Sequence, residues 1–100
     1  RKSKSPLTKK IIKMATIKNR TIMIHELKIL PKYFNEILQE NKSFELRRDR
    51  GFKVGDTIVL NEWIEEEKKY TGLNLVKSIK YISKDVPQYG LMEGFVILSI

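Results

Sequence analysis

After residue 22 the sequence alternates short strand patterns with turn signals, and only one stretch has the periodicity of a helix. In residues 31–40, Tyr33, Phe34, Ile37 and Leu38 form one apolar stripe of an amphipathic helix. Strand patterns occupy residues 21–30, 42–47, 57–63, 73–83 and 93–100. One main helix among about five strands, in a chain of 100 residues, predicts a single α+β domain folded as a small mixed β-barrel.

The end of the helix and the strand that follows it carry two finer predictions. Asn41 is expected to be the left-handed residue that ends the helix, because Asn tolerates positive φ better than most residues. In the next strand, side chains alternate between two faces. We expect Phe44 and Leu46 to face the core, and Glu45 and Arg47 to face the opposite way.

The charge of the chain is unevenly placed. Of the 20 Lys and Arg residues, eight fall within residues 1–22, which contain no acidic residue, so the remainder of the chain is neutral overall. Residues 11–20 have a weak amphipathic pattern that suits a short helix or a segment that orders on binding. We expect a basic, flexible or weakly helical arm over residues 1–22 that can bind polyanions, and a folded domain over residues 23–100.

Several classes of function are disfavoured by what the sequence lacks. It has no cysteine and a single histidine, so we expect no metal site and no bound cofactor. Its two central glycines form no phosphate-binding loop pattern. No apolar run approaches the length of a membrane span and no secretory signal is visible, so we expect a cytoplasmic protein that does not enter the membrane.

One stretch, residues 40–56, concentrates the reactive groups of the chain. Lys42, Glu45 and Arg47 stand at a K-x-x-E-x-R spacing, and Asp49 and Arg50 continue into a loop. Glu45 and Arg47 leave a strand on the same face, about 7 Å apart at the backbone. Two interpretations remain open here, the ordinary charged face of an exposed strand or a functional site at the junction of helix, strand and loop.

Two residues outside that stretch are further candidates for ligand contact. His25 shares a strand face with Leu27, which favours a partly buried core histidine over a ligand-binding one. Trp63 lies near a strand end, where an aromatic ring beside basic groups can stack on a base of single-stranded RNA. For most aromatic residues of the chain, packing in the core is the simpler interpretation.

The segment from residue 23 to residue 100 resembles the ASCH domains of the PUA-like superfamily, and in particular a group of short bacterial and phage-borne members of unknown function. The family hallmark is G-x-K-x-x-E-x-R, and Lys42, Glu45 and Arg47 match it. The leading glycine falls at Glu40, where this sequence departs from the pattern. Further matches are the "HELKIL" opening, "VGD" before a strand, the "EW" pair that ends at Trp63, and the closing "EGFVIL".

The resemblance implies a β-barrel with a cleft beside the hallmark strand and binding of RNA or a nucleotide. Our leading expectation is a nucleic-acid-binding module without catalysis, with RNA preferred. Its contacts would come from Lys42, Arg47 and Arg50, with Glu45 accepting from an exocyclic amine or orienting Arg47, and with His25 and Trp63 as further candidates.

The alternative is a small amidohydrolase acting on a modified nucleoside such as N4-acetylcytidine. Glu45 would then be the general base and Lys42 an electrostatic stabiliser. Similar small ASCH amidohydrolases use a Lys, a Thr and a Glu, with the Thr three positions after the Lys. That position is Glu45 here, so the sequence favours binding over catalysis.

Overall fold

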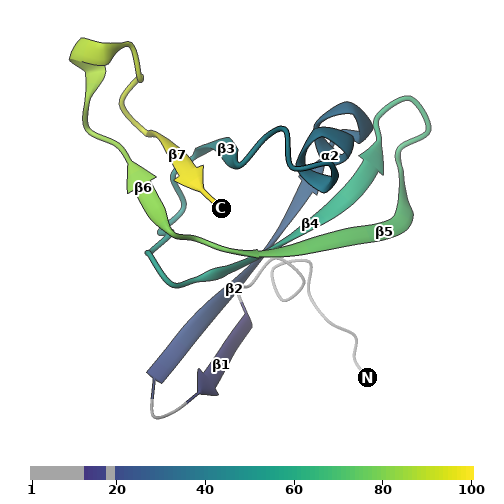
Figure 1. The fold of residues 1–100 in the computed structure, drawn as a ribbon, viewed down its shortest axis with the longest axis horizontal. Coiled ribbons are helices and arrows are strands. Elements are labelled where there is room, and N and C mark those ends of the chain that lie inside the picture. The colour runs from purple at the N-terminus through teal and green to yellow at the C-terminus, as the bar shows by residue number, and fades with distance from the viewer. Residues whose placement is uncertain (1–12, 18–19) are drawn as a thin grey trace, which may run out of the picture.

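The computed structural model describes residues 13–17 and 20–100, which form two β-sheets, one α-helix and a single turn of 3-10 helix (Figure 1). The elements are β1 (Lys13–Ile17), β2 (Arg20–Ile29), α2 (Pro31–Leu38), β3 (Phe44–Arg48), β4 (Thr57–Ile64), β5 (Lys69–Ser78), β6 (Tyr81–Ser83), η1 (Pro87–Tyr89) and β7 (Phe95–Ser99). The single α-helix is confirmed, and so are the strand patterns after residue 20 except that of residues 73–83, so the domain belongs to the α+β class.

The larger sheet has the strand order β1-β2-β4-β5. β2 and β4 are parallel neighbours, and the chain between them supplies α2 and β3. The other two pairs, β1 with β2 and β4 with β5, are antiparallel.

The smaller sheet has the order β3-β7-β6, with both pairs antiparallel. Its central strand, β7, buries Val96 and Leu98 and leaves the alternate residues half-buried. The apolar run of β7 therefore suits a central strand, but only one of its faces is fully buried.

The predicted closed barrel is wrong. Among the described residues no hydrogen-bonded strand pair joins the two sheets, so both sheets are open. The single strand predicted over residues 73–83 is also wrong, because the chain changes sheets at Ile79 and Lys80. The Ile79 amide donates to the Asp56 carbonyl beside the larger sheet, and the Lys80 amide donates to the Ser99 carbonyl in the smaller one. Closure of a barrel requires a continuous ring of paired strands, and this crossing divides the strands between two sheets instead.

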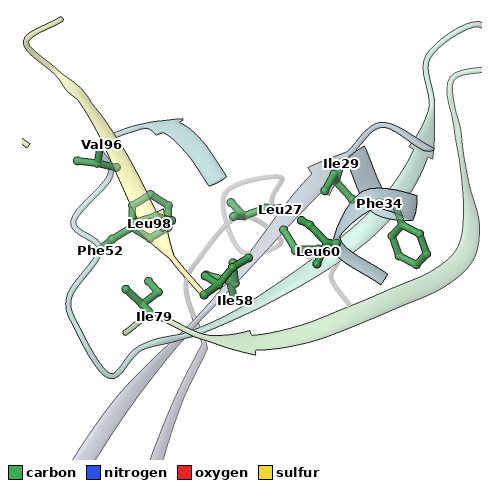
Figure 2. Packing of buried hydrophobic residues seen from close by; sticks show 11 residues of the cluster. Leu27, Ile29, Phe34, Phe52, Ile58, Leu60, Ile79, Val96 and Leu98 are labelled. Atoms are coloured by element: carbon green, nitrogen blue, oxygen red, sulfur yellow. The ribbon is translucent and has the colours of Figure 1, made fainter. Parts of the chain in front are cut away.

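The hydrophobic core fills the space between the two sheets and the helix (Figure 2). Alternate residues of β2 and β4, including Leu27 and Leu60, point inward, as their period of two predicted. They meet Phe34 of α2 on one side and Leu98 of β7 on the other. The core therefore holds the smaller sheet and the helix against the same face of the larger sheet.

The N-terminal prediction is tested only in part. Lys13–Ile17 form a strand paired with β2 rather than the short helix that the amphipathic pattern suggested. Residues 20–22, which the prediction placed in the arm, are the start of β2. Residues 1–12 and 18–19 lie outside the described residues, and the flexibility predicted for them remains a prediction.

Candidate functional site

The K-x-x-E-x-R segment begins at a tight turn that ends α2. The amide of Glu40 donates to the carbonyl of Ile37, and the amide of Asn41 donates to that of Glu36, which together are the two hydrogen bonds of a Schellman motif. The left-handed residue of this motif is Glu40, with φ 63°, and not Asn41 as predicted. Glycine is the usual residue in this conformation because it has no Cβ. The glycine of the hallmark pattern therefore aligns with Glu40, whose backbone conformation favours glycine.

The two faces of β3 are the reverse of those predicted. Glu45 is buried with 4% of its surface exposed, whereas Phe44 and Leu46 are 45% and 57% exposed. Register explains the difference, because Glu45 lies opposite Leu98, which is fully buried in the core. The charged side chains of the motif therefore point inward, and its apolar side chains point outward.

Lys42, Glu45 and Arg47 form one cluster, which we call the KER cluster. Lys42 Nζ donates to Glu45 Oε2 at 2.6 Å and to the Phe44 carbonyl at 2.6 Å. Arg47 Nε donates to the other carboxylate oxygen, Oε1, at 3.0 Å. A buried carboxylate is tolerated only when it is paired and hydrogen-bonded, and here both of its oxygens are engaged.

Arg47 also joins the two sheets. Its Nη2 atom lies 2.9 Å from Glu45 Oε1 and donates to the Lys28 carbonyl of β2 at 2.6 Å. The planar guanidinium group can satisfy these acceptors together because its donors form a rigid fork. The KER cluster therefore has a structural role as a bridge between β3 and the larger sheet.

A pocket of about 270 Å³ lies beside the C-terminal end of β3. Its lining residues are Leu27, Arg47, Arg48, Asp49, Arg50 and Phe52. Leu27 and Phe52 belong to the buried core, so the pocket combines apolar core side chains with three arginines and one carboxylate. Lys42 and Glu45 do not line it, so the KER cluster reaches the pocket only through Arg47.

Asp49 gives the pocket a fixed hydrogen-bond acceptor. Its Oδ1 accepts from the Gly51 amide at 3.0 Å, and its Oδ2 lies 3.7 Å from Lys84 Nζ. The Gly51 amide chiefly, and then Lys84, hold the pKa of Asp49 below its usual value. Gly51 has φ 94°, so glycine permits the loop that brings this amide to Asp49.

His25 lies behind the pocket and not in it. It is fully buried, and its Nε2 atom lies 2.8 Å from Oδ2 of Asp56, a buried carboxylate that also accepts from the Lys53 amide. Its ring packs against Phe52 with the centroids 4.6 Å apart. The interpretation of His25 as a core histidine is therefore correct, and it supports the pocket through Phe52. Its partner Asp56, the last residue of the "VGD" motif, was not predicted as part of this pair.

Trp63 lies outside the pocket, on the larger sheet. Lys28 Nζ stands 3.8 Å above its ring, Tyr70 packs edge-on at 4.8 Å, and its Nε1 donates to Glu65 at 3.0 Å. Glu65 also accepts from Lys68, and the hydrogen bonds from Lys68 and, secondly, from Trp63 lower the pKa of Glu65. Lys28 is a neighbour of both Trp63 and Arg47, because its ammonium group lies over the Trp63 ring and its carbonyl accepts from Arg47. Trp63 itself does not line the pocket.

Arg47 and Arg50 were therefore predicted as site residues, with Asp49 as their neighbour in the loop, whereas Leu27, Arg48 and Phe52 were not predicted to line a pocket. Arg48 and Asp49 follow Arg47 directly, so a basic strand end running into a glycine loop was the available signal. Leu27 and Phe52 gave no such signal, because their place in the pocket depends on tertiary packing. Within residues 13–17 and 20–100, no cluster of three or more His, Asp or Glu residues is arranged to hold a metal ion. No helix of the described part is long and apolar enough to cross a membrane.

This geometry defines a class of protein, a small α+β domain of two open sheets with a buried charge cluster beside an arginine-lined pocket. The chain belongs to the family described as Domain of unknown function (DUF3850), whose model matches residues 24–100. It is also similar to the "Uncharacterized 12.9 kDa protein in GpA 3'region" of Escherichia phage P2, with 44% identity over 43 residues. That match covers 42% of this chain and 39% of the phage protein, so the chain spans about two fifths of the length of its relative.

Proposed function

We propose that this domain binds nucleic acid, with RNA preferred, through the pocket at the end of β3. The observation that carries the proposal is the lining of that pocket, in which three arginines surround the apolar side chains of Leu27 and Phe52. Arginine is suited to phosphate because its forked donors match two phosphate oxygens, and apolar side chains suit the face of a base or ribose. A nucleotide unit carries both kinds of group.

The roles within the site follow from which donors are free to reach a ligand. Arg50 is exposed, with its guanidinium carbon 5.8 Å from the Phe52 ring, so it is placed to contact a phosphate over the pocket. Arg47 is anchored by Glu45 and the Lys28 carbonyl, and it presents a fixed positive charge. Asp49 is the acceptor for an exocyclic amine, because it is exposed and lines the pocket, whereas Glu45 is buried and does not line it. Lys42 adds positive charge to the same strand, and residues 1–22 would add salt-dependent affinity.

The preference for RNA rests on the resemblance to ASCH domains, and we propose that the family is related to them. Lys42, Glu45 and Arg47 match the hallmark, and Glu40 occupies the hallmark glycine position in the backbone conformation that glycine favours. The two open sheets differ from the barrel that this resemblance implied. The proposed relation therefore rests on the motif and its local geometry.

The proposal is tested by replacing Arg50 and a matched distant cation. We expect Arg50→Ala to weaken binding of a fluorescein-labelled single-stranded RNA and to lower the salt slope of log K by about 1, because one phosphate contact is lost. Lys69→Ala, in β5 on the larger sheet, is the control, since Lys69 is exposed and pairs only with Glu67. Equal loss of affinity in the two variants would show non-specific attraction and would contradict the pocket.

A second function is favoured by the contact between Lys42 Nζ and Glu45 Oε2, at 2.6 Å, which resembles an acid–base pair. In this alternative the domain hydrolyses N4-acetylcytidine, with water adding to the amide carbonyl and cytidine and acetate leaving. Glu45 stands where similar enzymes have a threonine. Release of cytidine that Glu45→Gln abolishes would support catalysis, and absence of cytidine at high protein concentration would eliminate it.

A further inference from the structure

The outer face of the smaller sheet, opposite the KER cluster, has the make-up of a binding surface. In β3 the exposed residues are Phe44, Leu46 and Arg48, and in β6 the exposed residue is Tyr81, which is 63% exposed. Phe44 and Tyr81 both pair with Ser99 of β7, so they flank the central strand in one row. The next row contains Leu46 and the half-buried Ile97. We call this surface, formed by Phe44, Leu46, Arg48, Tyr81, Phe95 and Ile97, the outer platform.

Cations accompany two of the aromatic rings of the outer platform. Lys42 Nζ stands 4.6 Å from the centre of the Phe44 ring, and the guanidinium carbon of Arg48 stands 4.7 Å from that of Phe95. The strands β3, β7 and β6 are fully described, and none of their outward-facing residues is a carboxylate. The platform therefore offers π faces and the positive charge of the exposed Arg48, whereas the charge of Lys42 is paired with Glu45, and its strands present no acidic group to repel a polyanion.

We infer that the outer platform stacks the bases of single-stranded nucleic acid. This inference rests on the proposed function and names the form of nucleic acid that the domain takes. Proteins that bind single strands combine aromatic rings, on which bases stack, with cations that follow the backbone. In a duplex the base faces are already covered by their neighbours, so the platform selects a strand whose bases are free to stack.

The charge of the platform argues against its alternative occupants. A second copy packed symmetrically on the same face would bury Arg48 of both copies against surfaces whose strands present no carboxylate to pair with it. The exposed rings flanked by cations instead complement a partner that carries both π faces and negative charge. Arg48 lines the pocket and also lies over Phe95 on the platform, so one strand could pass from the pocket to the platform around the end of β3.

The test compares aromatic residues of the outer platform with a tyrosine of the larger sheet. Tyr81→Leu and Phe44→Leu keep an apolar side chain but remove the ring, and stacking is worth about 1–3 kcal/mol per base, so each should weaken single-stranded RNA binding about fivefold or more. Tyr70→Leu is the matched control, because Tyr70 is 51% exposed in β5 of the larger sheet and should leave affinity unchanged. Fluorescence anisotropy with oligouridylate and with duplex RNA of equal length is the measurement, and thermal unfolding confirms that each variant folds.

The outcomes separate this inference from the pocket. Loss of affinity in Tyr81→Leu and Phe44→Leu, with Tyr70→Leu unchanged and oligouridylate bound more tightly than duplex, supports the platform. If Arg50→Ala weakens binding while both platform variants bind like the unaltered chain, the platform is overturned and the pocket stands. If the platform variants weaken binding and Arg50→Ala does not, the pocket fails and the platform stands. A change of oligomeric state in sedimentation, without a change in RNA affinity, would make the face a protein interface and overturn the inference.

Discussion

The two faces of β3 divide the hallmark segment into parts with different physical properties. The inner face carries Glu45 and Arg47, whose polar atoms are engaged with one another, with Lys42 and with the backbone of β2. The outer face carries Phe44 and Leu46, both exposed. A charge-rich motif therefore does not by itself mark where a ligand binds. The charges here hold two sheets together, and the available contact surface lies at the strand end and on the apolar side.

The largest effect on stability is expected when the carboxylate at the centre of the inner face is removed. We expect Glu45→Ala to lower the free energy of unfolding by about 3–5 kcal/mol, because it leaves two partly buried cations without their shared partner. Urea denaturation monitored by circular dichroism measures the change.

The control for that experiment is on the other face of the same strand. Leu46→Ala removes a side chain that is already 57% exposed, and we expect it to cost about 1 kcal/mol or less. Similar losses in Glu45→Ala and Leu46→Ala would break the contrast between the two faces.

A smaller effect tests the turn that places Lys42 at the inner face. Glu40→Gly should raise the free energy of unfolding by about 1 kcal/mol, because glycine adopts φ near 63° without the strain of a Cβ. The same denaturation assay applies, with Asn41→Gly as the control at the position where no positive φ is present. A greater gain in Asn41→Gly than in Glu40→Gly would contradict the assignment of the left-handed residue.

The smallest effect concerns Asp49, at the strand end where the two faces meet. The Gly51 amide and Lys84 depress the pKa of Asp49 in the folded state, so its contribution to stability is present above its unfolded value of about 4 and is lost as the pH falls through the folded pKa. Because Asp49 is exposed, screening keeps the effect small. Titration by NMR should give a pKa below the ordinary value of an aspartate in the unaltered chain, and a pKa closer to that value in Lys84→Ala. An unchanged value in that variant would remove Lys84 as a cause.

The sequence predicted the parts of the fold that local periodicity controls. The strand that buries His25 and Leu27 was correct, and so was the position of the helix, although only Phe34 and Ile37 of its predicted apolar stripe are buried. Residues 73–83 contain neither proline nor glycine, so nothing in the local sequence indicated that the chain changes sheets at Ile79. The barrel prediction failed at that point.

The candidate site was predicted in its residues but not in its orientation. Alternation separates Phe44 and Leu46 from Glu45 and Arg47, yet it does not say which set faces the core. Hydrophobicity favoured the wrong set, because the mutual pairing of three charged side chains offset the cost of burying Glu45. Of the apolar residues that line the pocket, Phe52 follows Arg50 by two residues, but Leu27 comes from β2, so only the folded structure brings Leu27 beside Arg50.

The most direct test of the account is a titration of the isotopically labelled full chain with short single-stranded RNA, followed by amide and side-chain NMR signals. We expect chemical-shift changes at the pocket residues 47–52 and at Phe44 and Tyr81 on the outer platform. The Trp63 indole, on the larger sheet, should not move. Shifts confined to residues 1–22, or absent altogether, would contradict the claim that the folded domain binds nucleic acid at the end of β3.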